Sequence, residues 1–447
     1  MEGTYERYKL IYDSYAARIC FGRCAFGDSL PAIPRIASEF HVAVPTVRSA
    51  LARLEADGLI RVEAKKAARV VYRAGPARFR ENAARYFVPR REGILDIVRT
   101  GGLLYDPLWE AGLRTWNRER TGAPPAAAGF SLTVLSSLGN HLVMNLCWEM
   151  IRYLCFPLLD AHGAAEDCLR ELRAGGDADR AKRACLAGWK QDIDELFAFL
   201  ETARAEYALE DVRPVPFEWN IYRQRPQLRY SIASRIIREI LEERYPVGSF
   251  LPSLPRMAER FGVAVSTVRR TLDLLDGLGV AASFQGKGTR VLMDPRRIDF
   301  SKPEVREALG LYAESLEFLA LTVRKVSLFT LEAASGETLD RLAERFARIR
   351  EEKKSYLVFE AYLAFITDAC PSAAVRQCYR KLNELLACGY PATLRRLGEN
   401  RLDNAFSGTI ARAQADLRAR DFERIAAGWQ GFLENEAERF RAFAARQ

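Results

Sequence analysis

The segment Gly27–Leu59, GDSLPAIPRIASEFHVAVPTVRSALARLEADGL, is repeated in this 447-residue chain as Gly248–Val280, GSFLPSLPRMAERFGVAVSTVRRTLDLLDGLGV. A constant shift of 221 positions aligns the two copies without a gap. Roughly half of the aligned residues are identical, which indicates duplication of one structural module.

The first copy has the pattern of three helices followed by a β-hairpin. Apolar residues at helical spacing predict a helix over Tyr8–Phe21 and two shorter helices over Ile33–Phe40 and Pro45–Asp57. Gly58 is expected to end the third helix. Alternation of apolar and polar residues over Leu59–Tyr72 then predicts two strands joined by a lysine-rich turn.

The second copy repeats this order. Helices are predicted over Ser231–Glu243, Pro255–Phe261 and Ser266–Leu278, followed by a hairpin over Val280–Leu292 with a glycine-rich tip. Three helices and a two-stranded wing form a winged helix-turn-helix, whose third helix enters the major groove of DNA.

About 150 residues of helical periodicity with few strand signals follow each module, and a 49% hydrophobic composition lets every domain bury a core. The expected fold class is mainly α, with winged helix-turn-helix domains over 1–75 and 227–293 alternating with all-α bundles over 76–226 and 294–447. Ser301–Glu304 has the form of a capping box. An apolar stripe follows it at Val305, Leu309, Tyr312, Leu316, Leu319 and Val323.

A gapped match of Leu172–Trp189 to Leu417–Trp429 indicates that the duplication extends into the helical regions. The competing interpretation is that any two helices rich in alanine, leucine and arginine align this well.

The positive charge of the chain is concentrated in the repeated modules. Residues 1–75 hold 12 Lys/Arg against 8 Asp/Glu, and residues 221–297 hold 14 against 7, whereas the net charge of the chain is +9. This distribution indicates that the repeated modules have surfaces that contact phosphate groups. The alternative is that an arginine-rich protein is basic without a functional reason.

The remaining composition points to a cytoplasmic protein that is not an enzyme. The nine cysteines include no C-x-x-C pair and lie mostly in apolar helical patterns, which favours a reducing compartment. Met1–Leu10 lacks the apolar core of a signal peptide, and no apolar stretch approaches the ~18 residues of a membrane span. There is no Walker loop or G-x-S-x-G motif, and the Gly286-x-Gly288 pair lies in a predicted hairpin, so no cofactor is expected.

Candidate DNA contacts gather at the start of each third helix and on each wing. The first turn of a helix in the major groove faces the bases, and its dipole favours phosphate. The guanidinium group of arginine can donate two parallel hydrogen bonds to guanine or to phosphate. A cation at the same position in both copies indicates contact with DNA rather than a charge that only faces solvent. The first copy supplies Arg35, Thr46, Arg48, Lys65, Lys66 and Arg69, and the second supplies Arg256, Ser266, Thr267, Arg269, Arg270, Gln285, Gly286, Lys287, Thr289 and Arg290. Because the first wing lacks glycines, we expect it to be less sharply shaped.

Both modules resemble the GntR family of bacterial transcription regulators over about 65 residues each. The family signature runs Leu-Pro-Ser-Glu-Arg, a short helix, Val-Ser-Arg-x-Thr-Val-Arg and a glycine-rich wing. Leu30-Pro31, Thr46-Val47-Arg48, Leu251-Pro252-Ser253, Thr267-Val268-Arg269 and Gln285–Gly288 match it. The resemblance implies a regulator that binds an operator in double-stranded DNA, as most relatives do as homodimers.

Two departures remove arginines that family members use on DNA. The Glu-Arg of the signature is Ile33-Pro34 in the first copy and Leu254-Pro255 in the second, and its Ser-Arg is Ala-Val in both. Arg35 and Arg256, one position later, are the candidates to replace the first arginine. The base preference of the family is therefore not transferred.

The helical region Phe130–Asn140 resembles the FCD class of effector domain, and Phe359–Pro371 is a weaker match. This resemblance implies antiparallel helical bundles that bind small acids, often through a metal held by one Asp and three His. The chain contains only His41, His141 and His162, so we expect no metal site.

An organic ligand, such as a small acid, is the expected effector, in a cavity between bundle helices. The alternative interpretation of these aromatic residues is that they belong to the hydrophobic core. The alternative for the arginines is that they face solvent. The candidate ligand residues are Trp148, Arg152, Tyr153, Arg376, Tyr379 and Arg380.

The leading hypothesis is a transcription regulator, acting as a repressor, whose two readers form a covalent pseudo-dimer or whose chains pair as a homodimer. One alternative is a DNA-architecture protein or plasmid replication initiator, which binding to origin repeats would favour. Another is a ligand-binding or scaffolding protein with degenerate readers, which would lack salt-dependent binding to a duplex.

Overall fold

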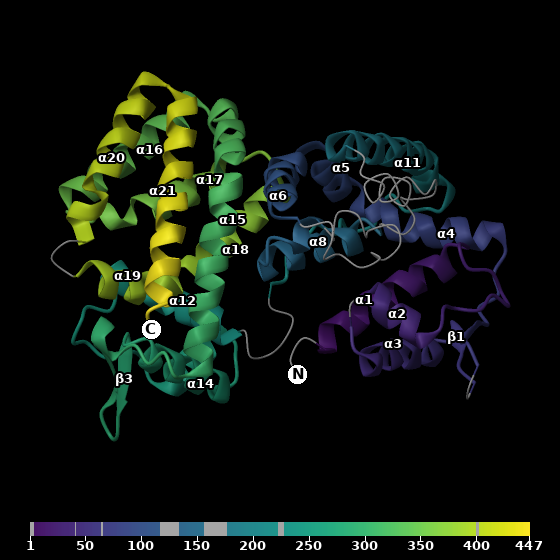
Figure 1. Cartoon of the computed structure of the whole chain (residues 1–447), viewed down its shortest axis with the longest axis horizontal. Coiled ribbons are helices and arrows are strands. Elements are labelled where there is room, and N and C mark those ends of the chain that lie inside the picture. The colour runs from purple at the N-terminus through teal and green to yellow at the C-terminus, as the bar shows by residue number, and fades with distance from the viewer. Residues whose placement is uncertain are drawn as a thin grey trace. The chain divides into compact units, whose positions relative to one another are not determined.

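The computed structural model describes residues 4–40, 42–63, 66–116, 134–155, 177–221, 228–398 and 402–447. The chain divides into two compact units, the first made of residues 1–99, 109–139 and 143–218 and the second of residues 100–108, 140–142 and 219–447. Helices dominate the described ranges, and strands occur there only as two antiparallel pairs (Figure 1). The predicted mainly α class is confirmed. No described helix has the length and apolarity to span a bilayer.

The first unit begins with the predicted three helices and a wing. Helix α1 (Thr4–Cys20) is followed by α2 (Ile33–Glu39), α3 (Val44–Ala56) and the strands β1 (Ile60–Arg61) and β2 (Arg69–Val70). These helices form because each places one apolar stripe inward. The buried residues of this core include Ile11, Tyr15, Ile36, Val47, Leu51 and Leu54.

The second unit contains the same module. Its elements are α12 (Leu228–Leu241), α13 (Leu254–Phe261), α14 (Val265–Gly277), β3 (Ala281–Phe284) and β4 (Gly288–Val291). Helix α12 packs against α14 inside the module. The prediction of two winged helix-turn-helix modules is confirmed.

Equivalent backbone hydrogen bonds close both modules. The Gly27 N–H donates to Val70 O at 2.9 Å, and the Gly248 N–H donates to Val291 O at 2.8 Å. Gly279 ends α14 with φ of 71°, where a Cβ atom would lie 2.2 Å from Asp294 O. Only glycine fits this left-handed position, so the predicted helix stop has a steric cause.

The rest of the first unit is helical. Helix α4 packs against α11 around Ala84, Ala203 and Leu209. The chain turns at Pro89 through a short 3₁₀ segment because proline lacks the N–H that would continue the helix. The elements are α4 (Pro76–Phe87), η1 (Val88–Arg90), α5 (Arg91–Thr100), α6 (Gly102–Thr115), α8 (His141–Tyr153) and α11 (Ala178–Glu206). Residues 100–108 and 141–142 of these helices belong to the second unit.

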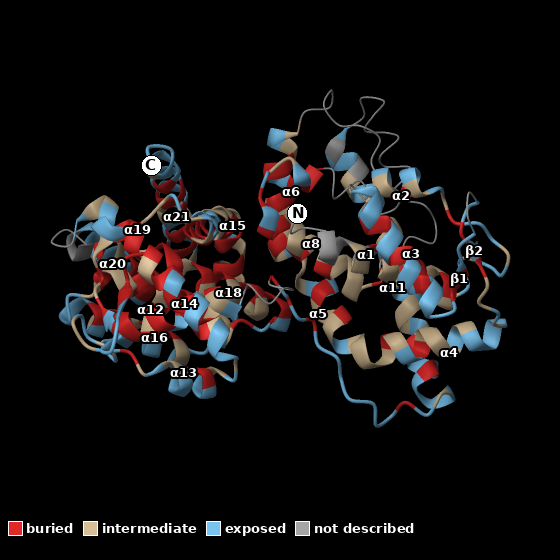
Figure 2. Ribbon diagram, turned by 90° about the horizontal axis from the view of Figure 1, so that it is seen from below, coloured by how far each residue is buried: buried red, intermediate tan, exposed pale blue. Residues whose placement is uncertain are grey.

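The bundle of the second unit is built around α15, which packs along α21 (Figure 1). The rings of Tyr312 and Phe440 meet edge to face at 4.8 Å, and those of Tyr362 and Trp429 stack at 4.6 Å. Figure 2 shows buried residues on the inner faces of these helices. The elements are η4 (Pro295–Arg297), α15 (Pro303–Ala333), α16 (Gly336–Glu351), η5 (Ser355–Leu357), α17 (Val358–Ala369), α18 (Ala373–Leu386), η6 (Ala387–Gly389), α19 (Tyr390–Leu397), α20 (Leu402–Ala419) and α21 (Phe422–Ala444).

The predicted capping box at the start of α15 is wrong. The N-cap residue is Lys302, whose side chain makes no capping bond, and the Ser301 hydroxyl donates instead to Asp299 Oδ1 at 2.6 Å. Because its hydroxyl is bonded to Asp299, Ser301 does not cap the helix. The apolar stripe that follows is confirmed, because all six of its residues are buried.

Candidate nucleic-acid interface

Helix α14 separates a buried face from a cationic exposed face. Val268, Thr271 and Leu272 are buried, whereas Arg269 and Arg270 are exposed. In an α-helix, residues three or four positions apart share a face, so the buried residues fix which residues point outward. Helix α3 does the same in the first unit, with Val47 and Leu51 buried and Arg48 exposed.

The N-termini of these two helices carry no side-chain cap. The N-cap residues are Ala43 for α3 and Ala264 for α14, and neither accepts a hydrogen bond from the first turn through its side chain. The first N–H groups of a helix need a partner and bind anions well. Pro45 in α3 removes one such donor, whereas the equivalent Ser266 of α14 keeps it and is exposed.

Within the described ranges, the arginines on the exposed faces make no ion pair, unlike their neighbours. Arg53 near the end of α3 lies 3.1 Å from Asp57, and Arg297 lies 3.4 Å from Asp276. Asp57 and Asp276 thus pair with arginines away from the start of each third helix. The cations at the start of these helices remain available to a polyanion. The exposed cations that form no ion pair with a described acid are Arg35, Arg48, Arg69, Arg256, Arg269, Arg270 and Lys287.

The wing of the second unit is a tight hairpin. Four residue pairs join β3 and β4, and Gly286 and Gly288 have φ of 71° and 100°. Lys287 and Gln285 are exposed at the tip. Arg290 is exposed as well, but its Nε donates to Gly248 O at 2.9 Å, so it is also anchored to the turn after α12.

In the first wing the described strands are shorter than those of the second. Only two residue pairs join β1 and β2. Lys66 is exposed and lies 2.6 Å from Glu63, and Arg69 is exposed. Lys65 lies outside the described residues.

Two predicted contacts are not on the surface. Thr46 is 2% exposed and Thr289 is 8% exposed, with the Thr289 hydroxyl 2.9 Å from that of Ser283. Thr46 stands four residues before Ala50, which is also buried, so the helical period could have predicted its burial. The equivalent Thr267 is half-buried.

Sequence reasoning missed an ion pair inside the second module. Arg260 of α13 donates to the buried Glu239 of α12, with Nη1 3.0 Å from Oε2. The positions equivalent to Glu239 and Arg260 in the first module hold Arg18 and Glu39, so the two charges are exchanged. The aligned repeats thus hold opposite charges at these two positions in both copies.

Three helices, a wing and an uncapped cationic third helix define a winged helix-turn-helix of the kind that binds DNA. Residues 7–70 and 228–291 each match the family described as bacterial regulatory proteins, gntR family. The chain therefore carries two domains that match the DNA-binding domain of this family.

Known relatives share parts of the chain. It is 30% identical over 141 residues to the "Putative HTH-type transcriptional regulator RmpR" of Mycobacterium gastri, a match that covers 29% of this chain and 50% of that relative. The chain thus spans half the length of this curated relative. Among solved structures, Streptococcus agalactiae GntR is 15% identical, with 48% of this chain and 99% of that chain covered and a TM-score of 0.23. A GntR family regulator from Pseudomonas syringae is 15% identical, with 48% and 84% covered and a TM-score of 0.22.

The candidate ligand residues of the first unit lie on α8. Arg152 and Tyr153 line a cavity of about 570 Å³ that also touches α1 and η1. Trp148 is half-buried on the same helix. Residues 130–133, where the FCD resemblance begins, lie outside the described residues.

Those of the second unit do not meet in one place. Arg376 donates to the carbonyls of Cys370 and Pro371, at 2.5 and 3.1 Å, and so holds the start of its own helix. Tyr379 is fully buried, with its hydroxyl 3.0 Å from that of Thr322, and Arg380 is exposed.

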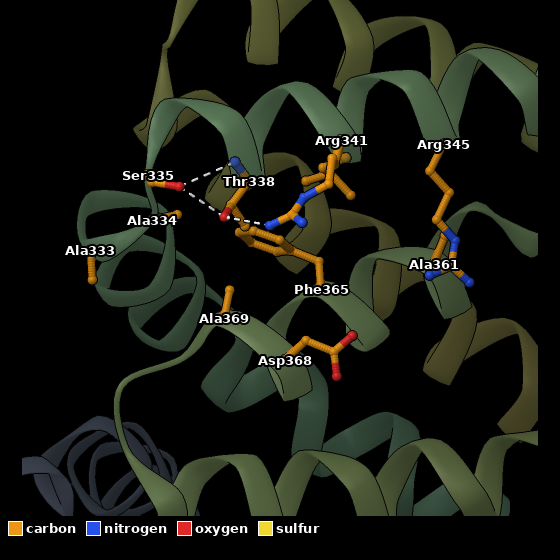
Figure 3. Close-up of a pocket in the computed structure, with 11 residues that line it drawn as sticks. Ala333, Ala334, Ser335, Thr338, Arg341, Arg345, Ala361, Phe365, Asp368 and Ala369 are labelled. Carbon is orange, nitrogen blue, oxygen red and sulfur yellow. Dashed lines mark hydrogen bonds between the residues drawn. The ribbon is translucent and has the colours of Figure 1, made fainter.

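A different cavity of about 530 Å³ opens between α16 and α17 (Figure 3). Arg341 and Arg345 line one side and Asp368 another, and Arg341 donates to the Thr338 hydroxyl at 3.2 Å. These charged residues are exposed, so solvent screens them. No group of three or more His, Cys, Asp or Glu able to hold a metal ion occurs among the residues that the structure describes.

Proposed function

We propose that the chain is a sequence-specific repressor whose two readers bind two half-sites of one operator, as a covalent pseudo-dimer. The observation that carries this proposal is the repetition of Arg48 as Arg269, each exposed at the start of an uncapped third helix. Two readers in one chain supply what a homodimer supplies with two chains. Pairing of chains through the bundles is the alternative assembly.

The proposed contacts divide into groove and backbone contacts. Arg48, Arg269 and Arg270 enter the major groove, where an arginine fork matches guanine. Lys287 at the tip of the second wing contacts the phosphate backbone. The other proposed contacts are Arg35, Lys65, Lys66 and Arg69 in the first unit and Arg256, Ser266, Thr267, Gln285, Gly286 and Arg290 in the second.

We further propose that a small organic acid is the effector and that the protein acts in the cytoplasm. A ligand that binds one arrangement of reader and bundle better than another shifts the population toward it. Such a shift in one unit changes how well the two readers fit a fixed pair of half-sites.

The test is selection of bound sequences from random duplex DNA by the full chain, followed by footprinting of the selected site. The expected result is that a single chain protects both half-sites, without a second chain. Protection of one half-site by the monomer contradicts the covalent pseudo-dimer. Binding that lacks both sequence preference and salt dependence contradicts the regulator itself.

A further inference from the structure

The wing of the second reader has an exposed face that carries two aromatic rings. Pairing of β3 with β4 sets Phe284 opposite Gly288. An isolated antiparallel bridge sets Phe250 opposite Arg290. Residues that pair across strands, and residues two apart along one strand, point to the same side of a sheet, so these four residues share one face. Phe284 is 45% exposed and Phe250 is 49% exposed, whereas Val291 on the opposite face is buried.

The two rings differ in what they do for the wing itself. A Cβ atom at Gly288 would lie 3.6 Å from Phe250 Cδ1, so the Phe250 ring covers the backbone of this glycine. An aromatic ring over a strand glycine stabilises a hairpin. No atom of Phe284 lies within 4 Å of that position. Phe284 stands at the end of β3, on a hairpin that extends away from the rest of the module (Figure 1). The fold of the wing therefore accounts for Phe250 but not for the exposure of Phe284.

The charges beside Phe284 are positive. Lys287 at the tip and Arg290 on the same face are exposed, and neither forms an ion pair with a described acid. The segment from Phe284 to Val291 contains no acidic residue. An apolar ring beside such cations complements a surface that is both apolar and negatively charged. The minor groove of DNA is such a surface, because sugar rings form its walls and the phosphates give it a negative potential.

The first wing lacks this combination. Under the constant shift of the repeat, Glu63 occupies the position of Phe284. Ser29 likewise occupies the position of Phe250. Glu63 Oε2 lies 2.6 Å from Lys66 Nζ, so an acid offsets the charge of the tip lysine in the first wing. An exposed aromatic side chain beside a tip cation that no described acid offsets is therefore a property of the second reader.

We infer that Phe284 is an apolar wedge that enters the minor groove beside the second half-site, and that the first reader has no counterpart. The inference rests on the proposed function, since it requires α14 in the neighbouring major groove. Only residues 278–280 separate α14 from β3, so the wing stays close to the helix and reaches the next groove. There the Phe284 ring packs against the sugars of the groove wall. The two readers therefore hold DNA differently, the second by apolar as well as ionic contacts.

The experiment combines hydroxyl-radical footprinting of the full chain on its selected duplex with affinities over a salt series. Hydroxyl radicals attack sugars that face the minor groove, so we expect protected sugars beside the second half-site and none at the equivalent place beside the first. Phe284→Ala should remove this protection and lower the affinity about tenfold, with the salt slope unchanged because no charge is lost. The matched control Phe284→Leu should keep most of both. Phe284→Glu, which copies the first wing, should bind more weakly than Phe284→Ala.

Several results would overturn the inference. Unchanged affinity and footprint in Phe284→Ala would show that the ring does not contact DNA, and a lowered salt slope would show that the lost contact was ionic. If Phe284→Ala changed the sedimentation of the free chain and left DNA binding intact, the aromatic face would join two copies of the chain instead. Protection of both half-sites without protected sugars beside the second would refute the wedge and leave the proposed function standing. A chain that bound no duplex sequence-specifically would refute both.

Discussion

Arg238 Nε on α12 lies 3.0 Å from Glu360 Oε1 on α17, so a reader helix and a bundle helix share one ion pair. Helix α12 also packs against α18 and η6, and the Ser234 hydroxyl lies 3.2 Å from the Cys388 thiol. The second reader is therefore part of the same packed body as its bundle. A change in the bundle can reach this reader without passing through a linker.

Replacement of Arg48 or Arg269 by alanine should weaken binding to a selected site by about 1–3 kcal/mol and relax base preference in one half-site. Each arginine is exposed at the start of a third helix, where a fork can reach a base edge. Titration of labelled duplex at fixed salt measures the loss. Arg53→Ala is the control, because Arg53 is paired with Asp57. Wild-type affinity in both arginine variants would contradict the groove assignment.

The two readers should prefer different half-sites because Arg270 corresponds to Ser49. Arg270 is exposed and makes no ion pair with a described residue, whereas the Ser49 hydroxyl donates to Pro45 O at 3.1 Å. Arg270→Ser should make the two selected half-sites more alike, and Ser49→Arg should do so from the other side. Sequencing of selected pools measures this, and unchanged half-sites in both variants would refute it.

Lys287→Ala should weaken binding to all sequences alike and lower the salt slope of log affinity by about 1. Lys287 stands at an exposed hairpin tip between two glycines, a position suited to phosphate. Affinities over a salt series measure the slope. A loss confined to one base position would instead indicate base contact by the wing.

Glu239→Gln should lower the free energy of unfolding of the second unit by about 1–3 kcal/mol, because it leaves the Arg260 charge without its buried partner. The double variant Glu239→Arg with Arg260→Glu copies the polarity of Arg18 and Glu39. It should recover only part of the loss, because Arg235 and Arg244 also lie 3.5 and 3.9 Å from Glu239. Urea unfolding measures both. A double variant no better than the sum of its single changes would show that the pair does not couple.

Stability should depend on Glu360 in a predictable direction with pH. Burial raises the pKa of the Glu360 carboxyl above its ordinary value of 4.5, and the Arg238 guanidinium offsets this only in part. The folded chain therefore binds this proton more readily than the unfolded chain, so the contribution of Glu360 to stability falls as pH rises above 4.5. Urea unfolding across this range should show that decline in the wild type relative to Glu360→Gln. If the stability of the wild type relative to Glu360→Gln instead rose with pH, the raised pKa assigned to Glu360 would be wrong.

Much of the interface could be predicted because it depends on local sequence. The register of each third helix follows from the apolar period, and the stop at Gly279 follows from the need for a left-handed residue. The same period would also have predicted that Thr46 is buried. Thr289 could not be placed this way, because its burial depends on a hydroxyl on the opposite strand.

The sequence alone determined that this chain holds two winged readers, since helix period, glycine position and the fixed shift of the repeat are all local or linear properties. Tertiary structure decided which charges meet. Asp13 and Arg152 are far apart in the chain, and so are Arg238 and Glu360, and neither pair has a spacing that predicts contact. Their pairing follows from how each reader helix packs on its bundle, because the energy of two charges depends on their distance and burial in space.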